Sequence, residues 1–400
     1  MISYEKAYRL TLERIEALEA EEVPLLAAVG RVAAQNLVGK VESPSVDVSL
    51  KDGYAIHSAD IVDASKETAV PLRLVGTVAA GGHWLRQVHL GEAVRILSGA
   101  PIPKGADAVV AEEFTQRFGD TILVNNDAYP GRNILPQGSD VHRGELLVRK
   151  GIQLTPPTVG LLAAAGHQSV PVVATPKVAI VATGDEVVAP GETLQPGKLY
   201  ASNLVTLAAW CVRYGSTVKT FVVRDDADLL RKELVTCLRD YDAVLTSGGA
   251  WSGERDLVVR LLDELGWHKA YHRVRLGPGK AVAFGVCAGK PVFCLPGGPP
   301  SNHMAFLQLA LPGLQKMGGW RTPGLPTQQM RLGETIESQQ DWTKCVYGRL
   351  EKTAELPTFY PLNPPSRLQM IAAAEAIIKI PEGQTVVEQG QIVEGQVLQS

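Results

Sequence analysis

The sequence predicts a multidomain α/β protein, because the pattern of apolar residues changes along the 400-residue chain. From residue 171 onward, apolar strand-like runs alternate with helical segments, which is typical of a doubly wound domain with a mainly parallel sheet. Between 46 and 138, short β-type runs separated by glycine and proline predict a smaller β-rich domain. Beyond 320, the runs indicate a terminal β domain, in which "MIAAAEAIIKI" also fits a helix.

Two helices are expected before the α/β domain. Residues 3–20 predict an amphipathic helix, because one face carries the apolar side chains of Tyr8, Leu12, Ile15 and Leu18. The stretch "LTPPTVGLLAAAG" predicts a second helix, with an N-cap at Thr155 and a stop at Gly166. Within the α/β domain, the expected strand and helix pairs are 177–184 with 203–214, 217–224 with 226–240, and 242–249 with 254–266. Strands at 281–287 and 291–298 then lead into a helix in 301–315.

Composition narrows the class of protein. A net charge of −3 without a basic block argues against a nucleic-acid or membrane-surface protein. The five cysteines form no C-x-x-C pair, and neither a signal-peptide pattern nor a run of about 20 apolar residues is present, so we expect a cytoplasmic location. His268 and His272 are four residues apart without a third ligand nearby, which favours structural histidines over a zinc site.

Three expected strands end in unusual loops. They are "TGDEV" from Thr183, "TSGGAWSGERD" from Thr246 and "LPGGPPSN" from Leu295. In an open α/β sheet, ligands bind beyond the carboxyl ends of the strands, and glycines there expose backbone N–H groups to an anion such as phosphate. One such loop is only a turn, but three on one sheet edge favour an anion-binding site, to which Ser247, Ser252 and Ser301 could add hydroxyl donors.

Carboxylates accompany these loops. Asp185, Glu186, Glu254 and Asp256 would repel a phosphate unless a divalent cation lay between them, which points to Mg²⁺. Helix capping explains Glu254 and Asp256 equally well when they are taken alone. Asp225 and Asp226 are weaker candidates, because Asp226 fits a plain N-cap. Lys280 belongs to no Walker motif, and is either a phosphate-binding charge or a solvated lysine.

Two loops of the β-rich segment are ordinary turns when read locally. They are "KDGYA", which contains Asp52, and "LSGAPIPKGADAVV", which contains Ser98.

Seven segments together resemble the MoeA family of molybdopterin molybdenumtransferases, which is related to the E domain of gephyrin. The family patterns "MDGYA", "TGAP-P-GADAVV" and "G-N-R--GED---G" correspond to "LKDGYA", "LSGAPIPKGADAVV" and "GRNILPQGSDVHRGELL" here. "STGDEL" and "SGGVSVGE-D" correspond to "ATGDEV" and "SGGAWSGERD". "KPGKP-AFG" and "LPGNPVSA" correspond to "GPGKAVAFG" and "LPGGPPSN". The matches follow the family's order from about residue 3 to the C-terminus.

The resemblance implies four parts. They are an elongated connecting domain (1–45 and 139–170), a β-rich lever domain (46–138), a doubly wound molybdopterin-binding α/β domain (171–320) and a C-terminal β-barrel (321–400). Family members are homodimers with the site at the subunit interface, where the lever of one chain closes over the pterin-binding domain of the other. The implied reaction combines adenylylated molybdopterin, molybdate and Mg²⁺ to give molybdenum cofactor and AMP. The resemblance also implies hand-over of the substrate from a molybdopterin adenylyltransferase.

By motif position, the resemblance assigns roles to particular residues. The implied catalytic residues are Asp52, Ser98, Glu186 and Asp256. Those implied to bind Mg²⁺ are Asp140, Glu186, Asp225, Asp226 and Asp256. The pterin or molybdate would contact Thr183, Gly184, Asp185, Ser247, Gly248, Gly249, Lys280, Pro296, Gly297 and Ser301.

The sequence departs from the family patterns at positions around this site. Lys51 precedes Asp52 in place of methionine, Trp251 enters the second loop, Gly277 and Gly298 replace a lysine and an asparagine, and Lys344 stands near an expected arginine. A lysine cannot reproduce the bidentate grip of an arginine. These changes favour one alternative to molybdate insertion, a non-catalytic pterin-binding scaffold of the same fold. The other alternative is a tungstate-inserting paralogue, because tungstate and molybdate are nearly equal in size and charge. A generic nucleotide-binding enzyme is less favoured, because no G-x-G-x-x-G follows a strand.

Overall fold

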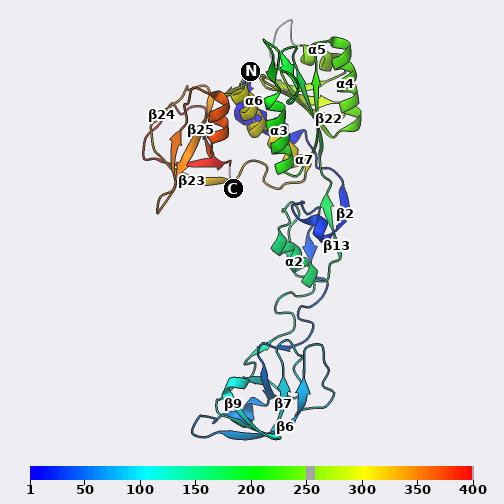
Figure 1. Ribbon diagram of the computed structural model, residues 1–400, viewed down its shortest axis with the longest axis vertical. Coiled ribbons are helices and arrows are strands. Elements are labelled where there is room, and N and C mark those ends of the chain that lie inside the picture. Colours follow the sequence, from blue (N-terminus) through cyan, green and yellow to red (C-terminus); the bar gives the residue numbers. More distant parts are fainter. Residues whose placement is uncertain (249–256, 399–400) are drawn as a thin grey trace.

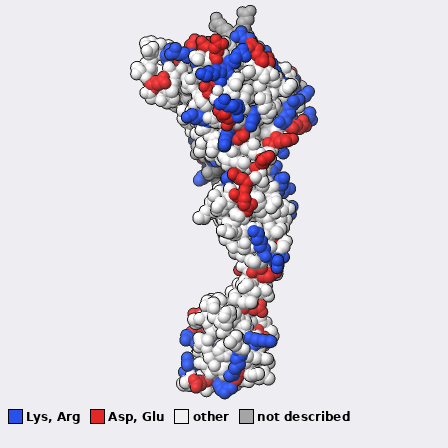
Figure 2. Space-filling model, turned by 90° about the vertical axis from the view of Figure 1, so that its right-hand side faces the viewer, with Lys and Arg blue, Asp and Glu red and all other residues white. Residues whose placement is uncertain are grey.

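The computed structural model describes residues 1–248 and 257–398. In Figure 1, the chain forms an elongated molecule in which an α/β domain and a β-barrel lie at one end and a β-rich domain lies at the other. A slender connecting domain, which contains α2, β2 and β13, lies between the two ends. On the face shown in Figure 2, basic and acidic side chains are interspersed along the molecule. No helix of the described residues is both long and apolar enough to cross a membrane.

The α/β domain has the strand order β17-β14-β18-β22-β21-β19. β14, β17, β18 and β22 are parallel, whereas β21 runs antiparallel to β22 and to β19. The bounds are β14 Lys177–Thr183, β17 Thr217–Val223, β18 Ala243–Ser247, β19 His268–His272, β21 Ala283–Cys287 and β22 Lys290–Leu295. Because β17 and β18 lie on opposite sides of β14, the chain reverses its direction of travel across the sheet between β14 and β18, where ligands bind in such folds.

Helices cover both faces of this sheet. Val178, Ile180 and Ala182 of β14 pack in one core with α3, α6 and α7, whereas Ala179 and Val181 pack on the other face against α4 and α5. The alternation follows from the period of two along a strand. The bounds are α3 Ser202–Arg213, α4 Ala227–Asp240, α5 Leu257–Glu264, α6 Pro299–Ala305 and α7 Leu311–Met317. The predicted doubly wound domain is confirmed.

A short π-helical segment, Phe306–Ala310, joins α6 and α7. Pro312 lies at the start of α7 and has no N–H group, so it cannot donate the usual hydrogen bond to the carbonyl four residues earlier. The loss of this donor accounts for the wider turn.

The β-rich domain carries a sheet of order β8-β5-β7-β6-β10-β9. The short β-type runs between glycine and proline predicted strands in this segment. Its strands are β5 Gly53–Ile56, β6 Val70–Val78, β7 Glu92–Ile96, β8 Ala108–Ala111, β9 Thr115–Phe118 and β10 Thr121–Val124.

The C-terminal domain is a closed barrel, as predicted. The sheet runs β25-β26-β23-β29-β27, and β27 also pairs with β25. Its strands are β23 Thr327–Leu332, β25 Thr343–Glu351, β26 Thr358–Pro361, β27 Ala376–Ile380 and β29 Ile392–Val397. The ambiguous segment "MIAAAEAIIKI" contains both structures, because α8 (Arg367–Ala373) ends before β27 begins.

The connecting domain is built from two passes of the chain. β2 (Ala20–Pro24) pairs with β13 (Ser169–Val173), so the expected boundary at residue 170 falls inside β13. Beyond them, β3 (Leu37–Val38) pairs with β12 (Leu146–Val148), and β4 (Val48–Ser49) pairs with β11 (Ile134–Leu135). The helix α2 (Pro156–Ala164) has its N-cap at Thr155, as predicted.

The N-terminal helix is shorter than predicted. α1 spans Tyr4–Glu13, not residues 3–20. The chain leaves the helix so that the Leu18 N–H donates to the carbonyl of Met317 at the end of α7, with an N···O distance of 2.9 Å. Ile15 is buried in the core shared with α6 and α7, and Leu18 packs against it. Tertiary packing therefore overrides the helical periodicity.

Candidate functional site

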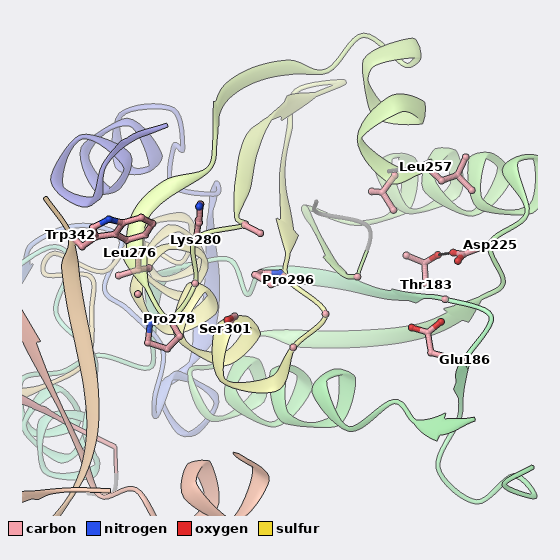
Figure 3. Close-up of a pocket in the computed structure, with 18 residues that line it drawn as sticks. Thr183, Glu186, Asp225, Leu257, Leu276, Pro278, Lys280, Pro296, Ser301 and Trp342 are labelled. Atoms are coloured by element: carbon pink, nitrogen blue, oxygen red, sulfur yellow. Dashed lines mark hydrogen bonds between the residues drawn. The ribbon is translucent and has the colours of Figure 1, made fainter. Parts of the chain in front are cut away.

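The carboxyl ends of β14, β18 and β22 meet at one pocket of about 530 Å³. In Figure 3, Lys280 and Trp342 lie at one end of this pocket, Thr183, Glu186 and Asp225 lie at the other, and Pro296 and Ser301 lie between them. The lining residues are Thr183, Gly184, Glu186, Asp225, Gly248, Leu257, Val258, Leu276, Gly277, Pro278, Gly279, Lys280, Ala281, Pro296, Gly297, Gly298, Ser301 and Trp342. An elongated pocket with a cation at one end and carboxylates at the other suits an extended anionic ligand with a counter-cation.

The acidic end is organised by the loop that follows β14. The Thr183 hydroxyl donates to Oδ1 of Asp225 at 2.7 Å, and the Asp225 N–H donates to Oδ1 of Asp185 at 3.3 Å. Gly184 has a φ of +143°, and a Cβ there would lie 2.7 Å from Oε2 of Glu186. Residues with a side chain rarely adopt this φ, so glycine is favoured here, and a larger residue would also displace the Glu186 carboxylate.

Two asparagines hold the middle of the pocket. Nδ2 of Asn302 donates to the Pro296 carbonyl at 2.8 Å and to Oγ of Ser247 at 3.0 Å. Nδ2 of Asn203 donates to the Gly297 carbonyl at 2.8 Å and to the same Ser247 oxygen at 3.3 Å. The loops after β18 and β22 are thereby joined through one hydroxyl.

The helix that carries Ser301 is fixed against the barrel. Nδ1 of His303 lies 2.9 Å from the Tyr347 hydroxyl, and the two rings are stacked at an interplanar angle of 7°. Burial lowers the pKa of His303 to about 4, so the imidazole is neutral at pH 7.

The basic end combines two domains. The β20 strand, Val274–Gly277, pairs in parallel with β25 of the barrel, so Leu276 lies opposite Thr343. This register brings Trp342, the residue before β25, to the pocket. The Lys280 ammonium nitrogen lies 5.4 Å from the centroid of the Trp342 ring, within the range of a cation–π interaction.

Most of the predicted pterin-binding residues meet at this pocket, together with Glu186 and Asp225 from the other predicted groups. Asp185 and Ser247 do not line it, but each bonds to residues that lie in or hold the pocket wall. Asp226 is the N-cap of α4, and its carboxylate accepts hydrogen bonds from the N–H groups of Asp228 and Leu229. This agrees with the interpretation of Asp226 as a plain helix cap. Gly249, Trp251 and Asp256 lie outside the described residues.

The remaining predicted residues lie elsewhere in the chain. Asp52 and Ser98 are in the β-rich domain, where the Ser98 N–H donates to Oδ1 of Asp52 at 2.7 Å. Both side chains are exposed. Asp140 is exposed where the connecting domain meets the β-rich domain, and its N–H donates to the carbonyl of Ser43 at 2.9 Å. The two ends of the molecule are well separated in Figure 1, so the pocket and the Asp52–Ser98 pair do not meet within one chain.

Several pocket residues were not anticipated from the sequence. Leu257, Val258 and Leu276 are apolar core-like residues without a chemical signal. Trp342 reaches the pocket only through the pairing of β20 with β25, which no local pattern reveals. Asn203 and Asn302 look like ordinary helix-start residues in the sequence.

Two of the departures from the family patterns, Gly277 and Gly298, line the pocket. Lys344 lines an adjoining pocket of about 530 Å³, which shares Gly277, Pro278 and Trp342 with the first. Its ammonium group donates to the carbonyl of Glu337.

No group of three or more His, Cys, Asp or Glu side chains in ranges 1–248 and 257–398 is arranged to hold a metal ion. Among the described residues, the carboxylates that line the pocket are Glu186 and Asp225. This number suits Mg²⁺, which proteins usually bind through one or two carboxylates while water and substrate phosphates complete its shell.

Comparisons with known proteins cover the whole length of the chain. Three family models match: the MoeA N-terminal region (domain I and II) over residues 2–166, a probable molybdopterin binding domain over 179–316, and the MoeA C-terminal region (domain IV) over 329–398. Molybdopterin molybdenumtransferase 2 of Mycobacterium tuberculosis H37Rv is 30% identical over 390 residues, which is 96% of each chain. The molybdopterin molybdenumtransferase of Bacillus subtilis strain 168 is 29% identical over 383 residues, which is 94% of this chain and 89% of the relative.

Among solved structures, a molybdopterin biosynthesis MoeA protein from Pyrococcus horikoshii superposes with a TM-score of 0.85. It is 32% identical to this chain, and the alignment covers 100% of both. Sequence, domain order and fold therefore agree over the full length, and the chain belongs to the MoeA family of molybdenum cofactor biosynthesis proteins.

Proposed function

We propose that this chain is a molybdopterin molybdenumtransferase, which inserts molybdate into adenylylated molybdopterin with Mg²⁺ and releases AMP. The observation that carries the proposal is the polarity of the pocket, in which glycine backbone lies between Lys280 at one end and Glu186 and Asp225 at the other. An anhydride of two phosphates needs both kinds of partner: donors for its oxygens and a cation between it and the carboxylates. The names of the full-length relatives support the same activity.

In this proposal, the backbone of Gly297 and Gly298, the Ser301 hydroxyl and the Lys280 ammonium bind the phosphate oxygens. Trp342, whose ring contacts Lys280, forms the wall beside them. Glu186 and Asp225 would hold Mg²⁺, which would neutralise charge on the phosphoanhydride oxygens. The protein's contribution is to position the substrates and to offset their negative charge.

The active assembly in this proposal is a homodimer. Asp52 and Ser98 form a hydrogen-bonded, exposed pair at the end of the molecule opposite the pocket. A second copy in antiparallel orientation would bring this pair to the pocket of its partner, and a twofold dimer would complete both sites at once. A molybdopterin adenylyltransferase would supply the adenylylated substrate.

A scaffold function is the second candidate, because Gly277 lines the pocket where the family pattern has a lysine. In the described residues that line the pocket, Lys280 is the single cation. If it cannot retain the oxyanion, the chain would bind the pterin without releasing AMP.

The test is to incubate the purified protein with adenylylated molybdopterin and Mg²⁺, adding molybdate or tungstate, and to follow AMP release and cofactor formation. Release of AMP with molybdate is the expected result, and a preference for tungstate would identify the tungstate-inserting alternative. Binding without AMP release with either oxyanion would overturn the enzymatic proposal in favour of the scaffold.

The dimeric site is tested by complementation. Asp52→Ala and Lys280→Ala are each expected to be inactive, because they remove opposite halves of the composite site. Equal amounts of the two, unfolded and refolded together, should recover roughly a quarter of the wild-type activity, because half of the dimers are mixed and each has one intact site. No recovery, with both variants folded and dimeric, would contradict a site shared between subunits.

A further inference from the structure

The asparagine pair that joins two pocket loops acts on peptide units, not only on side chains. Asn302 is 1% exposed, and its amide donates to the carbonyl of Pro296. The Asn203 amide donates to the carbonyl of Gly297, the next residue. Because backbone carbonyls only accept hydrogen bonds, the NH₂ group of each asparagine must face them, which fixes the orientation of both amides.

The hydrogen bonds to the carbonyls of Pro296 and Gly297 determine where the N–H groups of the same two peptide units point. Both peptide bonds are trans, so each N–H is directed opposite to its carbonyl. The N–H groups of Gly297 and Gly298 thus point away from the asparagine amides, and neither donates to a backbone or side-chain acceptor in the described part of the chain. Pro296, Gly297 and Gly298 all line the pocket.

The same two hydrogen bonds hold the carbonyl oxygens of Pro296 and Gly297 on the asparagine amides and away from a ligand in the pocket. Carbonyl oxygens that faced a phosphate would repel it, whereas unpaired N–H groups in succession form an anion-binding concavity. Ser247 links the two asparagines, because its hydroxyl oxygen accepts from both amides at the end of β18. With both lone pairs used, the Ser247 hydroxyl is left as a hydrogen-bond donor.

We propose that Asn203 and Asn302 are positioning residues that turn the N–H groups of Gly297 and Gly298 towards a phosphate of the bound pterin. This inference rests on the proposed function, which supplies the phosphate-bearing ligand. Asn302 stands where the family pattern "LPGNPVSA" ends in alanine, and Gly298 stands where that pattern has its asparagine. In this chain, the asparagine amide therefore comes four residues later, at Asn302. From there it donates to the Pro296 carbonyl.

The test compares binding and stability in matched variants. Asn302→Ala and Asn203→Ala each release one carbonyl, whereas Gln308→Ala removes another buried amide of the same helical segment, which bonds to Gln396 and not to the pocket. Isothermal titration of molybdopterin should show about tenfold to a hundredfold weaker binding for each asparagine variant, which corresponds to the loss of one hydrogen bond to a charged group. Gln308→Ala should lower the melting temperature and leave the dissociation constant within about twofold.

A further arm isolates the shared hydroxyl. Ser247→Ala keeps both carbonyl contacts, so its loss of affinity should be smaller than that of Asn302→Ala. Asn203 is only partly buried, so its variant remains informative if Asn302→Ala does not fold.

The outcomes separate the two proposals. If the wild type binds molybdopterin but both asparagine variants bind it equally well, the positioning role is overturned and the proposed function stands. If the wild type itself does not bind molybdopterin, the proposed function fails, and the positioning role fails with it.

Discussion

Gly248 lies where the loop after β18 approaches the end of β14, and Gly248→Ala tests how close this approach is. The backbone at Gly248 has a φ of +100°, and a Cβ would lie 2.7 Å from the carbonyl oxygen of Thr183. The conformational term alone costs about 1–2 kcal/mol for a residue with a side chain. Overlap with a backbone atom that cannot rotate away adds about 1–3 kcal/mol.

The sum, about 2–5 kcal/mol, predicts a fall in the melting temperature of the α/β domain of at least roughly 5 °C for a unit of this size. Differential scanning calorimetry is the assay, because it resolves the transitions of separate domains. Gly289→Ala is the matched control: Gly289 has a φ of +75° in the same domain, but a Cβ there meets nothing within 4 Å. Gly289→Ala should therefore lose only about 1–2 kcal/mol, which is what a positive φ costs a residue with a side chain. Equal melting temperatures for the two variants would refute the close approach of the loop to Thr183.

Three further predictions follow from the site and the β-rich domain. Glu186→Gln keeps the shape of the side chain and removes its charge, so Mg²⁺-dependent AMP release should fall by about 100-fold or more while molybdopterin still binds. Unchanged turnover would show that Glu186 does not bind Mg²⁺. Trp342→Ala removes the ring beside Lys280, so molybdopterin should bind about threefold to tenfold more weakly at unchanged thermal stability, and unchanged affinity would contradict its role as a wall. Hydrogen bonds from Arg86, from the His89 backbone and from Arg73 lower the pKa of Glu92 to about 2. The Glu92 carboxylate therefore stabilises the folded state above pH 4.5, and this contribution is lost as the pH falls towards 2. Glu92→Gln should therefore unfold at a lower temperature at pH 7 and show a smaller change between pH 5 and pH 3, and a wild-type pH dependence in the variant would contradict this.

The sequence was sufficient to predict features that depend on local pattern. β14 could be recognised because a strand buried on both faces is continuously apolar, and Asp226 could be recognised as a cap because it directly precedes the amphipathic helix α4. The glycines at 184 and 248 stood out because a strand that ends in glycine exposes backbone.

Features that depend on tertiary contacts could not be predicted. α1 ends early because Leu18 bonds to the end of α7, which is remote in sequence. Trp342 enters the pocket through the register between β20 and a barrel strand, and neither strand indicates its partner. The same holds for Asn302, whose amide bonds to the Pro296 carbonyl and the Ser247 hydroxyl, which lie on other elements of the chain.

The two passes of the connecting domain have a consequence for how such a protein can be built. Ser43 and Val141 are paired where the connecting domain meets the β-rich domain: the Ser43 N–H donates to the Val141 carbonyl at 2.9 Å. Beside this pair, the Glu42 carboxylate accepts the Arg143 N–H at 3.1 Å. The two chain segments that enter and leave the β-rich domain are therefore adjacent, and the domain is an insertion between segments that already pair with each other. Excising residues 44–140 and joining the ends by a tight turn should leave a protein that still folds at its other end and still binds the pterin. Pterin binding and turnover would then be separable by one deletion, because the excised residues include Asp52 and Ser98 and the remaining chain keeps the pocket.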